Sequence, residues 1–131
     1  MILVDTNAVS DFWRRVPQVM AHFDNPQTVF VPSVVIGELY YMALNSTRKA
    51  ENLERLDAFS SRHPILRPDA DTEFLYGYVV YRLKQRSLII PDHDAWIAAA
   101  ALQYDLPVLS RDKHLTYVNE IKVISWPTPS T

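Results

Sequence analysis

The chain has 131 residues, a length that suits one domain with a single hydrophobic core. It contains no cysteine, which excludes disulfides and thiolate metal sites, and no apolar run reaches the roughly 18 to 20 residues that a membrane span needs. The net charge of −2 argues against a protein that coats nucleic acid through bulk positive charge, and the presence of only two glycines excludes glycine-rich phosphate loops. We also find no signal peptide and therefore expect a soluble protein of the cytoplasm.

The first five residues consist of four apolar side chains followed by a carboxylate. Residues 1–4 do not alternate between polar and apolar, which is typical of a central strand in a parallel sheet covered by helices on both faces. In such sheets, ligand sites form beyond the carboxyl ends of the strands, where Asp5 would lie. Asp5 or Thr6 can also cap the helix that follows, so this segment by itself leaves both roles open.

The remainder of the chain alternates between helical and extended segments, which predicts a parallel sheet covered by helices. In chain order we expect a strand at 1–4, helices at 8–15 and 18–24, a strand at 28–31, helices at 34–44 and 49–62, a short strand at 65–66, a long helix ending near 87, a helix beginning at 91–92, a strand at 106–110, a short helix at 113–118 and an edge strand at 121–124. From about residue 125 we expect an irregular, frayed tail.

The helix expected at 34–44 carries a carboxylate among apolar neighbours. Ser33 is a suitable N-cap for this helix, and its predicted apolar stripe contains Val35, Leu39 and Met42. Glu38 lies within the same helix, and a glutamate is rarely buried without a partner. An exposed position on the outer face is the alternative, but the apolar neighbours favour a functional role.

The long helix that follows combines an apolar stripe with a basic end. Asp69 or Asp71 is expected to cap it, and the stripe contains the following residues: Phe74, Leu75, Tyr78, Val79 and Leu83. Arg82 and Arg86 lie at its polar end. They form either a solvated face or contacts to phosphates.

Two further carboxylates come from the last third of the chain. Asp92 and Asp94 both fall in the first turn of an alanine-rich helix. Capping a helix requires only one carboxylate, so the other is available for chemistry. Asp112 follows the apolar strand that ends at Ser110, which repeats the arrangement at Asp5. His93 and His114 are close to these carboxylates in sequence, but we expect each to be an exposed or capping residue.

If these carboxylates converge, they form a site for cations. Two unit charges about 4 Å apart repel by roughly 4 kcal/mol at an effective dielectric constant near 20, so a cluster of this kind either takes up protons or holds metal ions. Oxygen ligands without cysteine favour Mg²⁺ or Mn²⁺. Such a site suits the hydrolysis of phosphodiester bonds by a metal-bound water.

Taken together, four segments resemble PIN-domain ribonucleases, in particular the VapC-like toxins of toxin–antitoxin pairs. The matching segments are Val4-Asp5-Thr6-Asn7, Ser33–Leu39, Pro91–Ala99 and Leu109–Leu115. The resemblance implies a single domain over residues 1–131 with a three-layer α/β/α fold and a central, mainly parallel sheet of short strands. It also implies a Mg²⁺-dependent endoribonuclease that cuts tRNA, rRNA or mRNA, a neutralising VapB-like antitoxin and a homodimer.

The resemblance also implies roles for individual residues. Asp5, Glu38, Asp94 and Asp112 match the acidic quartet of the family, with Asp5 and Asp94 as direct metal ligands. Glu38 would bind metal or position the attacking water, and Asp112 would complete the site or hold a second ion. Supporting hydroxyls are expected at Thr6 and Ser110. Candidate phosphate contacts are Arg82, Arg86, Arg111 and Lys113.

Three other functions fit parts of the sequence. A catalytically silent module could use an acidic pocket only to bind a partner. A phosphatase of the haloacid-dehalogenase type also has an aspartate after its first strand, but it needs a second aspartate two residues later, where this chain has Asn7. A nuclease for single-stranded DNA would use the same metal chemistry as a ribonuclease.

Overall fold

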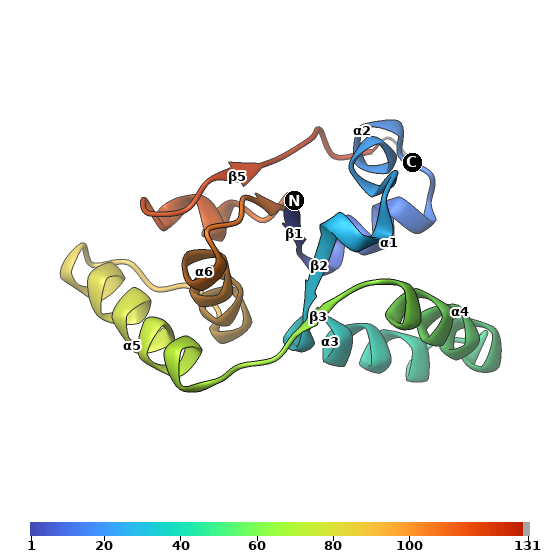
Figure 1. Cartoon of the computed structure of the whole chain (residues 1–131), viewed down its shortest axis with the longest axis horizontal. Helices are drawn as coiled ribbons and strands as arrows, with labels where there is room; N and C mark the ends of the chain where they lie inside the picture. Colours follow the sequence, from blue (N-terminus) through green and yellow to red (C-terminus); the bar gives the residue numbers. More distant parts are fainter. Residues whose placement is uncertain (130–131) are drawn as a thin grey trace.

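Five short parallel strands form the centre of the molecule, in the order β3-β2-β1-β4-β5 (Figure 1). The structure is a computed structural model and describes residues 1–129. The strands are β1 (Ile2–Val4), β2 (Val29–Pro32), β3 (Ile65–Leu66), β4 (Val108–Leu109) and β5 (Val123–Ile124). The unbroken apolar segment at the N-terminus is the middle strand, as its sequence predicts, whereas β4 and β5 are shorter than expected.

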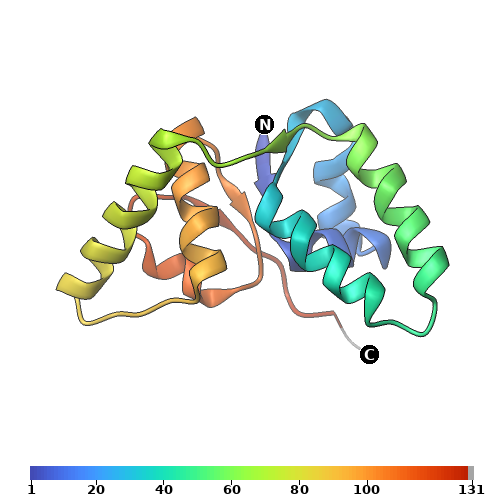
Figure 2. The ribbon, with the colours of Figure 1, turned by 90° about the horizontal axis from the view of Figure 1, so that it is seen from below.

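Helices cover both faces of this sheet, which gives the expected three-layer α/β/α arrangement. The helices are α1 (Thr6–Trp13), α2 (Pro17–Met20), α3 (Ser33–Leu44), α4 (Lys49–Arg62), α5 (Ala70–Gln85) and α6 (Asp92–Tyr104), with short 3-10 turns η1 (Ala21–Phe23), η2 (Pro26–Thr28) and η3 (Lys113–Tyr117). Helices α5 and α6 pack against each other on one side of the sheet, and α1, α2 and the α3–α4 hairpin lie on the other (Figures 1 and 2). Within residues 1–129, no helix is both long enough and apolar enough to span a lipid bilayer.

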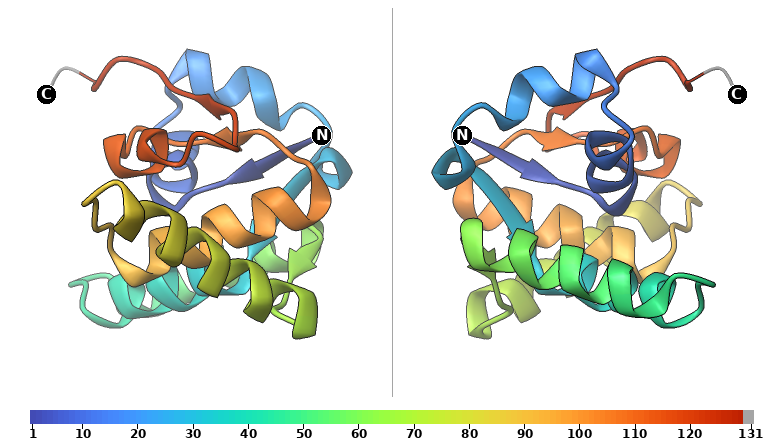
Figure 3. Two further views of the ribbon diagram at one scale, coloured as in Figure 1. Left: turned by 90° about the vertical axis from the view of Figure 1, so that its left-hand side faces the viewer. Right: turned by 90° about the vertical axis from the view of Figure 1, so that its right-hand side faces the viewer.

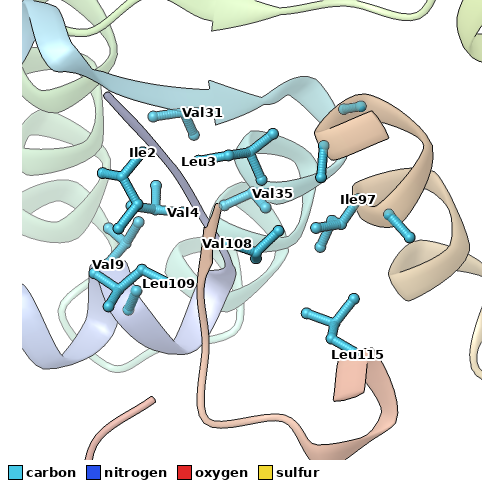
Figure 4. Packing of buried hydrophobic residues seen from close by; sticks show 14 of the residues in the cluster. Ile2, Leu3, Val4, Val9, Val31, Val35, Ile97, Val108, Leu109 and Leu115 are labelled. Carbon is cyan, nitrogen blue, oxygen red and sulfur yellow. The ribbon is translucent and has the colours of Figure 1, made fainter. Parts of the chain in front are cut away.

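The core is centred on β1, whose Leu3 and Val4 have no exposed surface. Val35 of α3, Ile97 of α6 and Leu115 of η3 pack around the strands (Figure 4). The buried side chains of α6 are mostly alanines, which allow the helix to lie close to its neighbours. Because each buried aliphatic side chain contributes about 1.5–3 kcal/mol, this core forms a firm support for the edge of the sheet above it.

One edge of the sheet gathers chain segments that are far apart in sequence. Because all strands are parallel, the carboxyl ends of β1, β2 and β4 meet at the same edge. Helix α6 precedes β4 and runs antiparallel to it, so α6 begins at this edge, on the side where β1 ends (Figure 3). This edge therefore receives the residues after β1, the start of α3, the start of α6 and the residues after β4.

Helix α3 departs from the expected pattern at two positions. Ser33 is its first helical residue and not its N-cap, because extended Pro32 ends β2 and the helix begins directly after it, without a side-chain cap. Met42 is 47% exposed and does not belong to the buried stripe. Ala43 takes that place, because the stripe continues from Val35 and Leu39 at a spacing of four residues.

Helix α5 is held in part by polar contacts that the apolar pattern did not predict. Asp69 is its N-cap, one of the two alternatives expected, and forms a capping box with Thr72. Gln103 of α6 also donates a hydrogen bond to Asp69. Phe74 was expected in the apolar stripe but is 70% exposed, because buried Thr72 faces α6 in its place.

The residues after β5 form no helix or strand up to residue 129, as expected for an irregular tail. The prediction that this tail is frayed is wrong at Trp126, which is buried and donates a hydrogen bond from Nε1 to Asp11. Residues 130 and 131 of the expected tail lie outside the described part of the chain.

Candidate active site

The four predicted carboxylates come together at the carboxyl edge of the sheet. Asp5, Glu38 and Asp112 line a cleft with a cavity volume of about 280 Å³. Asp94 has no exposed surface and lies behind His93, which also lines the cleft. The folding of this chain therefore brings together four side chains that are spread over more than a hundred residues of sequence.

Asp5 is both a helix cap and a member of the cleft. Its Oδ1 accepts a hydrogen bond from the backbone N–H of Thr6 at 2.7 Å, which makes it the N-cap of α1. Its Oδ2 accepts a hydrogen bond from Ser110 Oγ at 2.6 Å. Burial raises the pKa of Asp5 by more than these two bonds lower it. The capping role that the sequence left open is therefore confirmed, and the ligand role of Asp5 stays a prediction.

Ser110 connects the two strand-end carboxylates. Besides donating to Asp5, its Oγ accepts hydrogen bonds from the backbone N–H of Asp112 at 3.0 Å and from Asn7 Nδ2 at 3.4 Å. This arrangement fixes the positions of Asp5 and Asp112 relative to each other. Thr6 is adjacent, but its Oγ1 is buried and has no hydrogen-bond partner within residues 1–129.

Asp94 and Glu38 carry buried oxygens whose nearest cationic group is the His93 ring, with Nε2 3.1 Å from Asp94 Oδ1 and 3.9 Å from Glu38 Oε1. Both carboxylate oxygens of Asp94 and Oε1 of Glu38 are buried, and none accepts a hydrogen bond from the described residues. Such groups are rare in folded proteins because each loses its hydration without compensation. Burial and the neighbouring carboxylates, chiefly that of Asp112, raise the pKa of Asp94 to about 8. At neutral pH this position therefore favours a proton or a bound cation over a bare charge.

Asp112 is stabilised in its ionised form, in contrast to Asp94. It caps η3, and its Oδ1 accepts from the backbone N–H of His114 at 2.9 Å. Burial raises the pKa of Asp112, but hydrogen bonds, including those from His114, lower it by more because they favour the ionised carboxylate. The pKa of Asp112 therefore lies below its ordinary value. The pKa of Asp94 is thus raised and that of Asp112 lowered, so of the two neighbouring carboxyls Asp94 binds a proton more readily.

Two histidines lie within this cluster, and the prediction that they are exposed or capping residues is wrong. His93 Nε2 is 3.1 Å from Asp94 Oδ1, and His114 Nδ1 is 2.8 Å from Asp112 Oδ1. Ligand atoms of His93, Asp94 and Asp112 all lie within 4.8 Å of one another, close enough to hold one metal ion. The local spacing contains a usable signal, because His93 directly precedes Asp94 and His114 follows Asp112 by two residues.

Comparisons with known proteins identify the family of this chain. Residues 2–121 match the PIN domain. This chain belongs to the PIN domain family. Ribonuclease VapC2 of Rickettsia felis is 37% identical over 75 residues, an alignment that covers 57% of this chain and 56% of that protein. Ribonuclease VapC2 of Haemophilus influenzae is 29% identical over 84% of this chain and 85% of its own length. The crystal structure of VapBC2 from Rickettsia felis bound to a promoter DNA fragment matches with a TM-score of 0.85 and 26% identity, over 97% of this chain and all of that chain.

The basic residues of this PIN domain fall into two groups. Arg111, a predicted phosphate contact, lines the cleft together with Arg14, which the sequence pattern did not single out. Exposed Lys113 follows Asp112 at the start of η3. Arg82 and Arg86 lie near the end of α5 and do not line the cleft. Arg82 donates to the hydroxyl of Tyr78, and Arg86 donates to the backbone carbonyl of Tyr117.

Three residues at the cleft of the PIN domain were not predicted as site residues from the sequence. Asn7 accepts a hydrogen bond from the backbone N–H of Arg111 through its Oδ1, and Arg14 reaches the rim from the end of α1. Asp11 lies behind both arginines and binds them. Asp11 and Arg14 lie on the helix that begins at Asp5, at positions three residues apart, and this spacing was the available signal.

Proposed function

We propose that this PIN domain is a metal-dependent endoribonuclease toxin that hydrolyses phosphodiester bonds of RNA and is neutralised by a VapB-like antitoxin. The observation that carries the proposal is the set of unpaired buried oxygens on Asp94 and Glu38, next to Asp5 and Asp112 in one open cleft. An arrangement of this kind is unfavourable in the absence of cations and suited to holding them. The relatives named as ribonucleases supply the class of reaction.

The residues present fit a divalent ion that prefers oxygen ligands. Mg²⁺ is proposed, with Mn²⁺ as the alternative, because carboxylates dominate the cluster and no cysteine is present. A bound ion of this type lowers the pKa of its water and offsets the charge that develops on the leaving oxygen. Asp5 and Asp94 are the proposed direct ligands.

The surrounding residues hold the ligands and the substrate. Ser110 and Thr6 fix the orientation of Asp5 through its two oxygens. Glu38 binds metal or orients the attacking water, and Asp112 completes the site or holds a second ion. The proposed contacts to RNA phosphates are Arg82, Arg86, Arg111 and Lys113.

The proposed setting is a cytoplasmic toxin–antitoxin pair in which the toxin forms a homodimer. The Rickettsia felis relative was crystallised as VapBC2 on its promoter DNA, which supports an antitoxin partner for this chain. Exposed apolar side chains on two helices offer surface for such partners. They are Tyr41, Met42 and Leu44 on α3, and Phe74, Val80 and Tyr81 on α5.

The direct test is the cleavage of RNA by the purified chain and by Asp5→Asn. With Mg²⁺ present we expect the wild type to cut total RNA, EDTA to stop the reaction, and Asp5→Asn to lose activity by at least about 10³-fold. The amide can still accept the bond from Thr6, so the fold should persist, as circular dichroism would show. Asp92→Asn is the matched control, because Asp92 is exposed, bonds to Tyr76 and does not line the cleft.

The same assay separates the competing functions. A silent binding module would leave RNA intact at every Mg²⁺ concentration. A nuclease for single-stranded DNA would cut a labelled DNA strand faster than an RNA strand of the same sequence. Full cleavage of RNA by folded Asp5→Asn would contradict the proposed role of the acidic cluster.

A further inference from the structure

A second buried carboxylate, Asp11, lies behind the rim of the cleft and outside the acidic cluster. It sits on α1 and has no exposed surface. Its Oδ1 accepts a hydrogen bond from Arg14 Nη1 at 3.0 Å. Its Oδ2 accepts two more, from Arg111 Nε at 2.9 Å and from Trp126 Nε1 at 2.9 Å. Asp11 therefore joins the first helix to segments that are 100 and 115 residues away in sequence.

Arg111 is held on three sides at this point. Its backbone N–H donates to Asn7 Oδ1, its Nε donates to Asp11, and its guanidinium carbon lies 5.7 Å from the centre of the Trp126 ring. Its side chain is 22% exposed and lines the cleft. Among residues 1–129, Nη1 and Nη2 of Arg111 donate no hydrogen bond, so the outer edge of the guanidinium is available to a ligand.

The Arg111 side chain needs this restraint because the acidic cluster attracts its positive charge. A guanidinium beside four carboxylates is attracted into the cluster, where it would pair with Glu38 or Asp94 and take the place of a cation. Asp11 offers a competing carboxylate behind the rim, and it binds Nε while leaving the planar outer edge unoccupied. That edge matches the bidentate geometry of a phosphate.

The charge of Asp11 is stable in this position. Burial raises its pKa, but the hydrogen bonds from Trp126, Arg111 and Arg14 outweigh burial and leave the pKa below the ordinary value. Asp11 therefore stays ionised at neutral pH and keeps its ion pairs with Arg14 and Arg111.

We propose that Asp11 and Trp126 are positioning residues that hold Arg111, together with Arg14, at the rim of the cleft, where their outer N–H groups bind RNA phosphates beside the scissile bond. The proposal rests on the proposed ribonuclease function and extends it to the C-terminal segment. The tail after β5 thereby becomes part of the substrate site, although it contributes no residue to the acidic cluster.

The alternative is that the contact between Asp11 and Trp126 only anchors the tail. In that case the loss of the indole N–H would lower stability and leave RNA binding unchanged. Trp126→Phe separates the two roles, because it keeps an aromatic ring near Arg111 and removes the N–H donor to Asp11 together with one ring of the indole. If Trp126 positions Arg111, this variant binds RNA more weakly. If Trp126 only anchors the tail, the folded variant binds RNA as well as the wild type does.

The experiment measures binding by the full-length chain to a fluorescein-labelled, 2′-O-methylated oligouridylate with Ca²⁺ in place of Mg²⁺, by fluorescence anisotropy over a range of salt concentrations. We expect Arg111→Ala to weaken binding roughly tenfold and to reduce the slope of log K against log salt by about 0.7, the value for one lost contact to a single strand. Trp126→Phe should weaken binding roughly threefold. Arg48→Ala is the matched control, because Arg48 is exposed, pairs with Glu51 and does not line the cleft, and it should change binding by less than about twofold.

The double variant gives the decisive result. If Trp126 acts through Arg111, adding Trp126→Phe to Arg111→Ala should change affinity by less than about 1.5-fold, because the two effects are not additive. The inference would be overturned if Trp126→Phe reduced the affinity for the probe equally in the wild type and in Arg111→Ala, or if it did not reduce the affinity of the wild type. If the wild type cleaves RNA while Arg111→Ala binds the probe normally, this inference and the proposed phosphate contact of Arg111 fail, whereas the ribonuclease activity stands. If the wild type neither binds nor cleaves, the proposed function fails with it.

Discussion

Asp11 on α1 and Asp94 on α6 both have no exposed surface, yet their surroundings are opposite. Asp11 accepts hydrogen bonds from three side chains, and its pKa is lowered. Neither oxygen of Asp94 accepts a hydrogen bond from the described residues, and burial together with nearby carboxylates raises its pKa to about 8. The same chemical group thus accepts hydrogen bonds from three side chains in one region, whereas in the other it accepts none within residues 1–129 and has only the His93 Nε2 at 3.1 Å beside it.

The comparison indicates how this fold separates structural charge from charge used for binding. A buried carboxylate with every donor in place is satisfied by the protein and has no need of a ligand. A buried carboxylate without donors is tolerated only where a proton or a cation completes it. This difference is the basis for proposing that Asp11 organises the rim of the cleft and that Asp94 binds the ion.

The largest expected effect comes from removing the charge of Asp94. Asp94→Asn should reduce RNA cleavage by at least about 10³-fold, because an amide is a poor ligand for the proposed ion. The same change should raise the melting temperature in EDTA at pH 8, because it removes an unpaired buried charge. Cleavage rates and calorimetry of the one variant test both statements. A variant that is inactive and also less stable would contradict the contrast with Asp11.

The next effect concerns the stability that Asp11 supplies. Asp11→Ala should lower the free energy of unfolding by about 3 kcal/mol, because it leaves the Arg111 guanidinium and the Trp126 N–H without their buried acceptor. Urea unfolding followed by circular dichroism measures this. Asp24→Ala, at an exposed position, is the control and should change stability by less than about 0.5 kcal/mol. A loss as small as that of the control would mean that the pairing is not stabilising.

Metal binding should distinguish the two aspartates as well. Mg²⁺ at about 100 times its dissociation constant should stabilise the wild type by roughly 2.7 kcal/mol, since it binds only the folded chain. Asp94→Asn should lose most of this gain, whereas Asp11→Ala should retain it from a lower starting stability. Thermal unfolding with Mg²⁺ and with EDTA is the measurement. If Mg²⁺ stabilised the wild type and Asp94→Asn equally, Asp94 would not be a ligand of the ion.

The smallest expected effect is a difference in pH dependence. Because the folded-state pKa of Asp11 lies below its ordinary value of 3.8, its contribution is present above that pH and is lost as pH falls through the folded-state pKa. The stability difference between wild type and Asp11→Ala should therefore stay constant above about pH 5 and shrink as the pH falls below 3.8. Asp94 has a raised pKa, so in EDTA it should destabilise the wild type relative to Asp94→Asn increasingly as pH rises toward about 8. If both variants showed the same pH dependence of stability relative to wild type, the proposed difference between Asp11 and Asp94 would be refuted.

Features encoded in neighbouring residues were predictable from the sequence. An unbroken apolar strand followed by Asp5, a glutamate in an apolar helix and a strand ending before Asp112 each carry a local signal, and the alternation of helices and strands implies the parallel sheet. Because a parallel arrangement places the strand ends at one edge, Asp5 and Asp112 could be grouped from the strand pattern, whereas the full set of four carboxylates was implied by the resemblance to PIN-domain ribonucleases.

The features that the sequence did not reveal depend on contacts between distant segments. Nothing near Asp11 indicates that its partner is Trp126, 115 residues later, and a proline-rich tail with one tryptophan resembles an unpacked end. The exposure of Phe74 and Met42 likewise depends on which neighbours are present, because helical spacing defines a stripe but not its exact edge. Capping preference failed at Ser33, because a strand that ends in Pro32 leads directly into the helix.

The acidic cluster takes its members from segments that begin after β1 and end after β4. Ribosomes make a chain from its N-terminus, so Asp112 is the last of the four to emerge, and β4 must add to the sheet before that residue can take its place. Under the proposed function, a nascent chain of this design would not cleave the RNA of the ribosome that makes it until nearly the whole chain has been released. A fragment that stops before residue 112 lacks a member of the cluster, so incomplete synthesis or proteolytic clipping there would yield an inactive product.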